Sequence, residues 1–184
     1  DNNMIPEKYK NYMFNENDFL PQDYHVEDPE KREYLKIAAA MISDDIQVGG
    51  NPKKIQESDP DFWLLDRLLT KEEVKMVASF KKKRVVKLSI EEVAKRNKMD
   101  VVDAQNMIDH ICEIGIIEFD RENEDHHRQY FVPKWVVGSG EYMMMNGKLL
   151  EDHPEVATFF NYASSVPVGK VAHMVPPGGG GLGM

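Results

Sequence analysis

The chain has 184 residues, 41% of them hydrophobic and 30% charged, with 23 Lys and Arg against 32 Asp and Glu. This composition supports a buried core, but no stretch approaches the roughly 20 consecutive apolar residues of a membrane-spanning helix, so we expect no membrane span. The single cysteine, Cys112, excludes an internal disulfide and any all-cysteine zinc or iron–sulfur site within this chain. The first residues also lack the basic-then-apolar order of a secretion signal, and together these features predict a protein of the reducing cytoplasm.

Residues 1–65 are predicted to form an extended arm followed by a helix. The arm, residues 1–27, contains five aromatic residues without helical or strand period, which is typical of a segment that wraps onto another surface. Asp28 followed by Pro29 is a helix-start signal, and apolar residues then recur at helical spacing over Glu30–Ser43. A second ordered block is expected to begin near Asp59.

Two capping boxes predict the next two helices. In the first, the Thr70 side chain is expected to accept from the Glu73 amide while the Glu73 carboxylate reaches back to the cap amide. In the second, Ser89 and Glu92 have the same spacing, and the helix that follows is predicted to run through Asn97. The apolar residues expected to face inward are Val74, Val77, Ala78 and Phe80 in the first helix and Ile90, Val93 and Ala94 in the second.

A longer helix and a hairpin are predicted next. Asp100 is expected to cap a helix to Ile114, with Gly115 in the left-handed conformation that ends many helices. Its buried stripe is predicted to consist of Ala104, Met107, Ile108 and Ile111. Ile116–Phe119 and Gln129–Val132 read as two strands joined by a polar turn. Helix, helix, turn, helix and hairpin is the order of a winged helix-turn-helix.

The predicted fold class is therefore mainly α with a small β-hairpin (α+β). We divide the chain into an extended arm plus helix (1–65), a winged helix-turn-helix (66–137) and a helical extension with a Pro/Gly-rich linker (138–184). Within the extension, a helix is expected to begin at Pro154 and run to about Ser164.

The charge pattern bears on whether this module binds DNA. Counterion release along a cationic face supplies much of the affinity of DNA-binding proteins, and a recognition helix presents Arg, Asn, Gln or Lys to base edges. The outward face of the third helix is instead predicted to present Asp103, Asn106, Asp109, His110 and Glu113. The expected hairpin turn is also rich in acidic residues. We therefore interpret the module as a protein-docking unit and nucleic acid as an unlikely partner.

Residues 71–88 carry a net charge of +5, mostly from the run that includes Lys81, Lys82 and Lys83. This run is a second candidate partner contact. Through it, the chain could also act as a free-standing adaptor protein that recruits an electron carrier. The alternative to a protein-docking function is that of a stand-alone winged-helix transcription regulator that binds DNA. We identify no catalytic residue and no metal ligand set, and the cofactor-binding residues stay unknown.

Several stretches together resemble a region of known redox proteins: Ile116–Phe119, Gln129–Pro133, Gly138–Met143, His153–Phe160 and His173–Gly179. The resemblance, over about residues 66–184, is to the N-terminal region of large iron–sulfur flavoproteins of anaerobic bacteria, of the pyridine nucleotide-disulfide oxidoreductase type with ferredoxin-like clusters. It implies a non-catalytic module of an oxidoreductase that mediates domain or subunit contacts in electron transfer. It also implies [4Fe-4S] clusters and FAD in the parent protein or complex, none of them within this segment, with downstream redox domains or partner subunits as binding partners.

Overall fold

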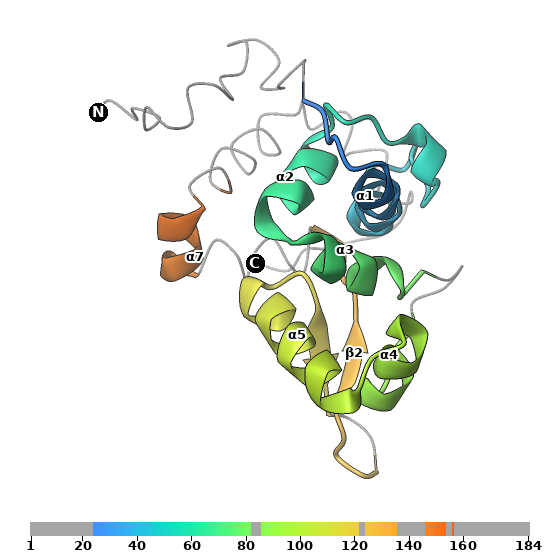
Figure 1. The fold of residues 1–184 in the computed structure, drawn as a ribbon, viewed down its shortest axis with the longest axis vertical. Helices are drawn as coiled ribbons and strands as arrows, with labels where there is room; N and C mark the ends of the chain where they lie inside the picture. The colour runs from blue at the N-terminus through green and yellow to red at the C-terminus, as the bar shows by residue number, and fades with distance from the viewer. Residues whose placement is uncertain (1–23, 82–85, 122–123, 136–145, 154–155, 157–184) are drawn as a thin grey trace, which may run out of the picture.

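The computed structural model describes residues 24–81, 86–121, 124–135, 146–153 and 156. These residues form a mainly helical structure with one small two-stranded antiparallel sheet, which confirms the predicted α+β class (Figure 1). In chain order the elements are α1 (Pro29–Ile42), the 3-10 helix η2 (Pro52–Lys54), α2 (Pro60–Leu68), α3 (Lys71–Ala78), α4 (Ile90–Asn97), α5 (Val101–Ile114), β1 (Glu118–Asp120), β2 (Gln129–Phe131) and α7 (Gly147–Asp152). The predicted arm lies outside the described residues over positions 1–23.

Helix α1 begins at Pro29 with Asp28 as its N-cap, as predicted, and ends at Ile42, one residue before the predicted end. The Asp28 carboxylate accepts from the backbone amides of Glu30 at 2.9 Å and Lys31 at 3.1 Å, so it satisfies two of the amides that a helix start leaves unpaired. The buried face of this helix consists of Leu35, Ala38, Ala39, Ala40 and Ile42. Small side chains on this face allow a close approach to α3, against which α1 packs.

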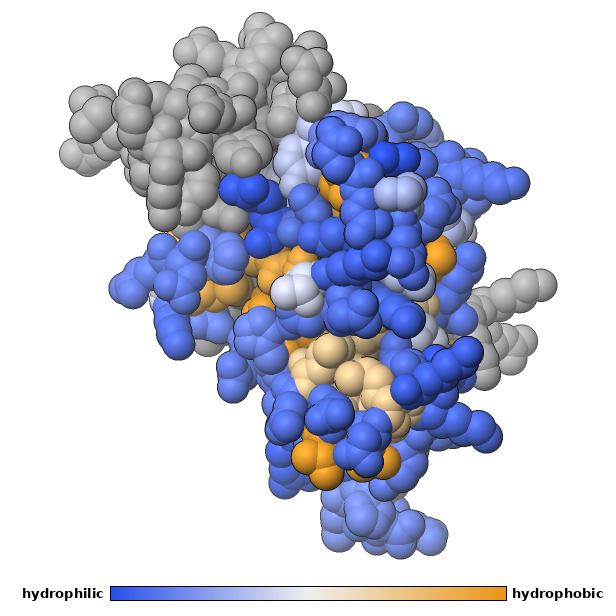
Figure 2. All heavy atoms as spheres, in the orientation of Figure 1, coloured by the Kyte–Doolittle hydropathy of each residue, from blue (hydrophilic) through white to orange (hydrophobic). Residues whose placement is uncertain are grey.

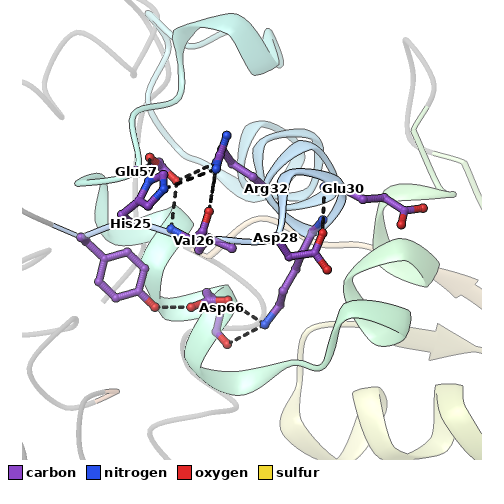
Figure 3. Close-up of polar contacts among 9 residues, drawn as sticks. His25, Val26, Asp28, Glu30, Arg32, Glu57 and Asp66 are labelled. Atoms are coloured by element: carbon purple, nitrogen blue, oxygen red, sulfur yellow. Dashed lines mark hydrogen bonds and ion pairs between the residues drawn. The ribbon is translucent and has the colours of Figure 1, made fainter.

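The residues just before α1 are held against the segment that leads into α2 (Figure 3). The Glu57 carboxylate accepts from the Val26 amide at 3.1 Å and forms ion pairs with His25 at 2.8 Å and Arg32 at 3.2 Å. Within α2, Asp66 forms an ion pair with Lys31 at 2.6 Å. These contacts join residues far apart in sequence, so positions 24–32 have a defined place on the fold.

Helix α2 was not predicted from the sequence. Four consecutive apolar residues, 62–65, give no helical period, and yet all four side chains are buried. The helix crosses the predicted division between residues 65 and 66, and its side chains belong to the same hydrophobic core as those of α1, α3, α4 and α5. The first two predicted segments therefore share one core within the described residues.

Both predicted capping boxes are present. Glu73 N donates to Thr70 Oγ1 at 3.3 Å while Glu73 Oε1 accepts from Thr70 N at 3.0 Å, and Ser89 and Glu92 make the equivalent pair of bonds. The inward-facing residues predicted for these helices are buried, except Ile90, which is half-buried. Helix α5 starts and ends as predicted, and Gly115 has a φ of 95° at its end.

The hairpin differs from prediction at its first strand. Strand β1 spans Glu118–Asp120 because the Ile116 amide still donates to Ile111 O at 3.2 Å and completes the end of α5. Phe119 lies opposite Tyr130 in the register, and Leu88 extends the sheet by a bridge to Tyr130 with two backbone bonds of 2.8 Å.

Helix α3 lies centrally, with α1 and α2 above it and with α4, α5 and the hairpin below it in Figure 1. The helix predicted from Pro154 lies almost entirely outside the described residues, whereas α7 was not predicted. Asn146 caps α7 and donates from Nδ2 to the Glu113 carbonyl at 3.0 Å, so α7 adjoins the end of α5. No helix in the described ranges combines the length and apolarity needed to cross a membrane.

Candidate functional site

The outward face of α5 has the polar side chains predicted for it. Asp103, Asn106, His110 and Glu113 are exposed, and Asp109 is half-buried. The core side of the same helix contains Ala104, Ile108 and Ile111, all fully buried, whereas Met107 from the predicted stripe is only partly buried. The 3.6-residue period thus places the acidic residues in solvent, while their role as partner contacts remains a prediction.

Part of this face lines an open hollow between α5 and the start of α3. Seven residues line it, and we call it the α3–α5 hollow: Thr70, Glu73, Met99, Asp103, Asn106, Met107 and His110. Its volume is about 570 Å³. Figure 2 shows a pale-orange area of moderately apolar atoms between α3, α4 and α5, bordered by hydrophilic side chains. An apolar floor with a polar rim is the arrangement found in protein-binding sites.

Glu73 joins the two helices that border the hollow. One carboxylate oxygen caps α3, and the other forms a hydrogen bond with His110 Nδ1. The Glu73 residue is 7% exposed. The sequence identified Glu73 only as a cap. Its second role depends on how α3 and α5 pack, for which the local pattern contains no signal.

The remaining two predicted contacts of α5 lie away from the hollow. Asp109 accepts from Gln105 at 2.8 Å and from Arg128 at 3.5 Å, and Gln105 also donates to the Tyr130 hydroxyl at 3.0 Å. Asp109 therefore faces the hairpin. The Glu113 carbonyl is bonded to the cap of α7, at the opposite end of α5 from Asp103.

The predicted basic run is separate from the hollow. Lys81 is exposed after the C-terminal end of α3, whereas Lys82 and Lys83 lie outside the described residues. The hollow includes Thr70 and Glu73, at the N-terminal end of the same helix. Eight helical residues rise about 12 Å, so the two candidate surfaces are at opposite ends of α3.

Asp61 and Cys112 both have strongly raised pKa values. Burial raises the pKa of the Cys112 thiol to about 12, and a nearby Asp109 carboxylate adds to this effect. Burial likewise raises the pKa of Asp61 to about 6, although hydrogen bonds from Trp135 and Ser43 act in the opposite direction. A protonated thiol is a poor nucleophile and a poor metal ligand. Neither group lines the α3–α5 hollow.

Among the described residues, no three His, Cys, Asp or Glu side chains are grouped so that they could hold a metal ion. Comparison of the chain with protein-family models, with curated proteins and with solved structures finds no match.

Proposed function

We propose that residues 66–137 form a winged-helix module that docks onto other polypeptide domains and performs no chemistry itself. The described elements support this fold assignment: α3, the extended residue Leu88, α4, α5 and the β1–β2 hairpin follow one another in the order of a winged helix. The isolated bridge from Leu88 to Tyr130 lies beside the two-stranded hairpin, at the position where a winged helix has its short third strand.

The observation that carries the docking function is the α3–α5 hollow on the exposed face of α5. In a DNA-binding winged helix this face would meet base edges and phosphates. Here Asp103 and Glu73 place negative charge around a methionine-lined surface, and no Lys or Arg lines the hollow. Phosphate groups would be repelled at this surface, whereas a partner protein can bury its apolar floor.

The partner class comes from the sequence resemblance. This resemblance supports a parent oxidoreductase of the cytoplasm. Its downstream domains or partner subunits would hold the [4Fe-4S] clusters and FAD, and the present module would mediate contacts between those domains or subunits. Cys112, the only cysteine, is half-buried and has a raised pKa, which fits a module that relies on other domains for cluster ligands.

Two measurements test the proposed function. Anaerobic purification of the native protein from its source, followed by intact mass and absorption spectroscopy, should yield a larger polypeptide or complex with flavin and iron–sulfur bands. Electrophoretic mobility of duplex DNA at low salt should not change on addition of the 184-residue chain. A colourless species of 21.2 kDa that retards DNA would replace this proposal with the transcription regulator.

A further inference from the structure

We infer that the α3–α5 hollow binds a cationic, amphipathic segment of the partner polypeptide, in which an apolar side chain is flanked by Lys or Arg. This inference rests on the proposed docking function and names the chemistry of the occupant.

The floor requires an apolar side chain. Met99 and Met107 are partly buried and pack against the hydrophobic core, yet both line the open hollow. Methionine side chains are unbranched and polarizable, so they adapt to an apolar side chain of variable shape. An entirely polar partner would leave this surface without a complementary contact.

The rim requires a cation. Both carboxylate oxygens of Glu73 already have partners within the fold, in Thr70 and His110. The Asp103 carboxylate is exposed and makes no ion pair or hydrogen bond with any other described residue. Asp103 is thus the lining group that can take a new Lys or Arg at no cost to an existing contact.

No Lys or Arg among the lining residues is available to pair with Asp103. His110 is engaged with Glu73, and the remaining lining side chains, Thr70 and Asn106, are neutral. The net charge of the rim is therefore negative, and electrostatic complementarity selects a cationic segment over an anionic one. An acidic segment would be repelled by Asp103 and Glu73 together.

The test uses a fluorescently labelled helical peptide that presents Leu residues one turn apart, flanked by Lys. Fluorescence anisotropy measures its binding to the full chain and to two charge-reversal variants, Asp103→Lys and Glu91→Lys. Glu91 is a matched control because it is an exposed acidic residue in the first turn of α4 and does not line the hollow. We expect binding about tenfold weaker in Asp103→Lys and changed by less than about twofold in Glu91→Lys.

Two further measurements distinguish specific docking from nonspecific electrostatic attraction of a cationic peptide to a chain of net charge -9. A peptide with Ser in place of Leu should lose binding, and a peptide with Glu in place of Lys should bind Asp103→Lys better than the unaltered chain. With ¹³C-labelled methionine methyl groups, the Met99 and Met107 signals should shift, whereas that of the fully buried Met76 should not.

Equal weakening in both variants, or peptide-induced shifts that spare Met99 and Met107, would overturn the inference. If the native complex forms through another face, as shown by normal assembly of Asp103→Lys with its redox partners, the inference falls while the proposed function stands. If the chain binds duplex DNA and no redox partner, the proposed function itself fails.

Discussion

Trp135 donates a hydrogen bond from its indole Nε1 to the carboxylate of Asp61, a residue 74 positions earlier in the chain. The bond joins the segment that follows β2 to the first turn of α2. Next to it, Lys134 donates to the Ser43 carbonyl at 2.5 Å, at the end of α1. This contact fixes the exit of the hairpin against the N-terminal helices, and it makes the fold sensitive to pH.

Asp61→Asn should remove most of a pH dependence of stability. Burial raises the pKa of Asp61 from 3.8 to about 6 in the folded state, so the folded state binds the proton more tightly than the unfolded state does. Stability is therefore expected to fall as pH rises from about 4 to about 6, by up to about 3 kcal/mol. Asn keeps an oxygen acceptor for Trp135 but does not titrate, so Asp61→Asn should be more stable than the unaltered chain above pH 6.

Urea denaturation between about pH 4.5 and about pH 7.5 measures this effect. Asp59, whose pKa burial also raises, contributes with the same sign and is unchanged in the variant. The lowered pKa values of Asp28 and Glu30, caused first by hydrogen bonds from Lys71, act with the opposite sign below about pH 4.5. A variant whose stability follows the same pH curve as the unaltered chain would contradict the assigned role of Asp61.

Leu88→Ala should destabilise the fold by about 2–4 kcal/mol, because it opens a cavity at a residue that is 2% exposed and that bridges the hairpin to the helices. Ile46→Ala is the matched control, since Ile46 is 62% exposed and should change the free energy of unfolding by less than about 0.5 kcal/mol. Chemical denaturation of both variants measures the difference. Similar free energies of unfolding for the two variants would mean that Leu88 does not pack as described.

Thr70→Ala should cost about 1 kcal/mol, because it removes the side-chain acceptor of the Glu73 amide at the start of α3. Ser89→Ala removes the equivalent acceptor from α4 and should cost a similar amount. Thr70→Ser, which retains the hydroxyl, should be close to the unaltered chain in thermal unfolding. Equal loss in Thr70→Ser and Thr70→Ala would show that the methyl group, not the cap, provides the stability.

Cys112 should react slowly with thiol reagents while the chain is folded. Its raised pKa of about 12 leaves little thiolate near neutral pH, and its side chain is half-buried. Alkylation by iodoacetamide at about pH 8 should be at least tenfold slower in buffer than in denaturant. Equal rates in the two conditions would contradict the burial of this thiol.

Local signals predicted much of the fold. The caps at Thr70, Ser89 and Asp100 and the left-handed Gly115 each depend on residues within one turn of chain, and all four are present as expected. Helix α2 was missed because four consecutive apolar residues, 62–65, have no helical period, and their burial depends on tertiary packing such as that of α1 against α2.

The site was predicted only in part for the same reason. The helical period placed Asp103, Asn106 and His110 on one exposed face, and the structure brings these three to one hollow. It could not place Glu73 and Met99 beside them, because their positions depend on how α3 and α4 pack against α5. Nor could it show that Asp109 faces Arg128 and the hairpin.

The most direct test of docking through the α3–α5 hollow is site-specific photo-crosslinking in the native, full-length protein or complex. A photoreactive amino acid replaces Asn106, which lines the hollow, and in a parallel preparation replaces Glu91, which does not. Mass spectrometry then maps the crosslinked peptides. We predict that position 106 crosslinks to a Lys- or Arg-containing apolar segment of a flavin or iron–sulfur domain and that position 91 does not. Crosslinks from position 106 to DNA, or the same products from both positions, would contradict docking at this face.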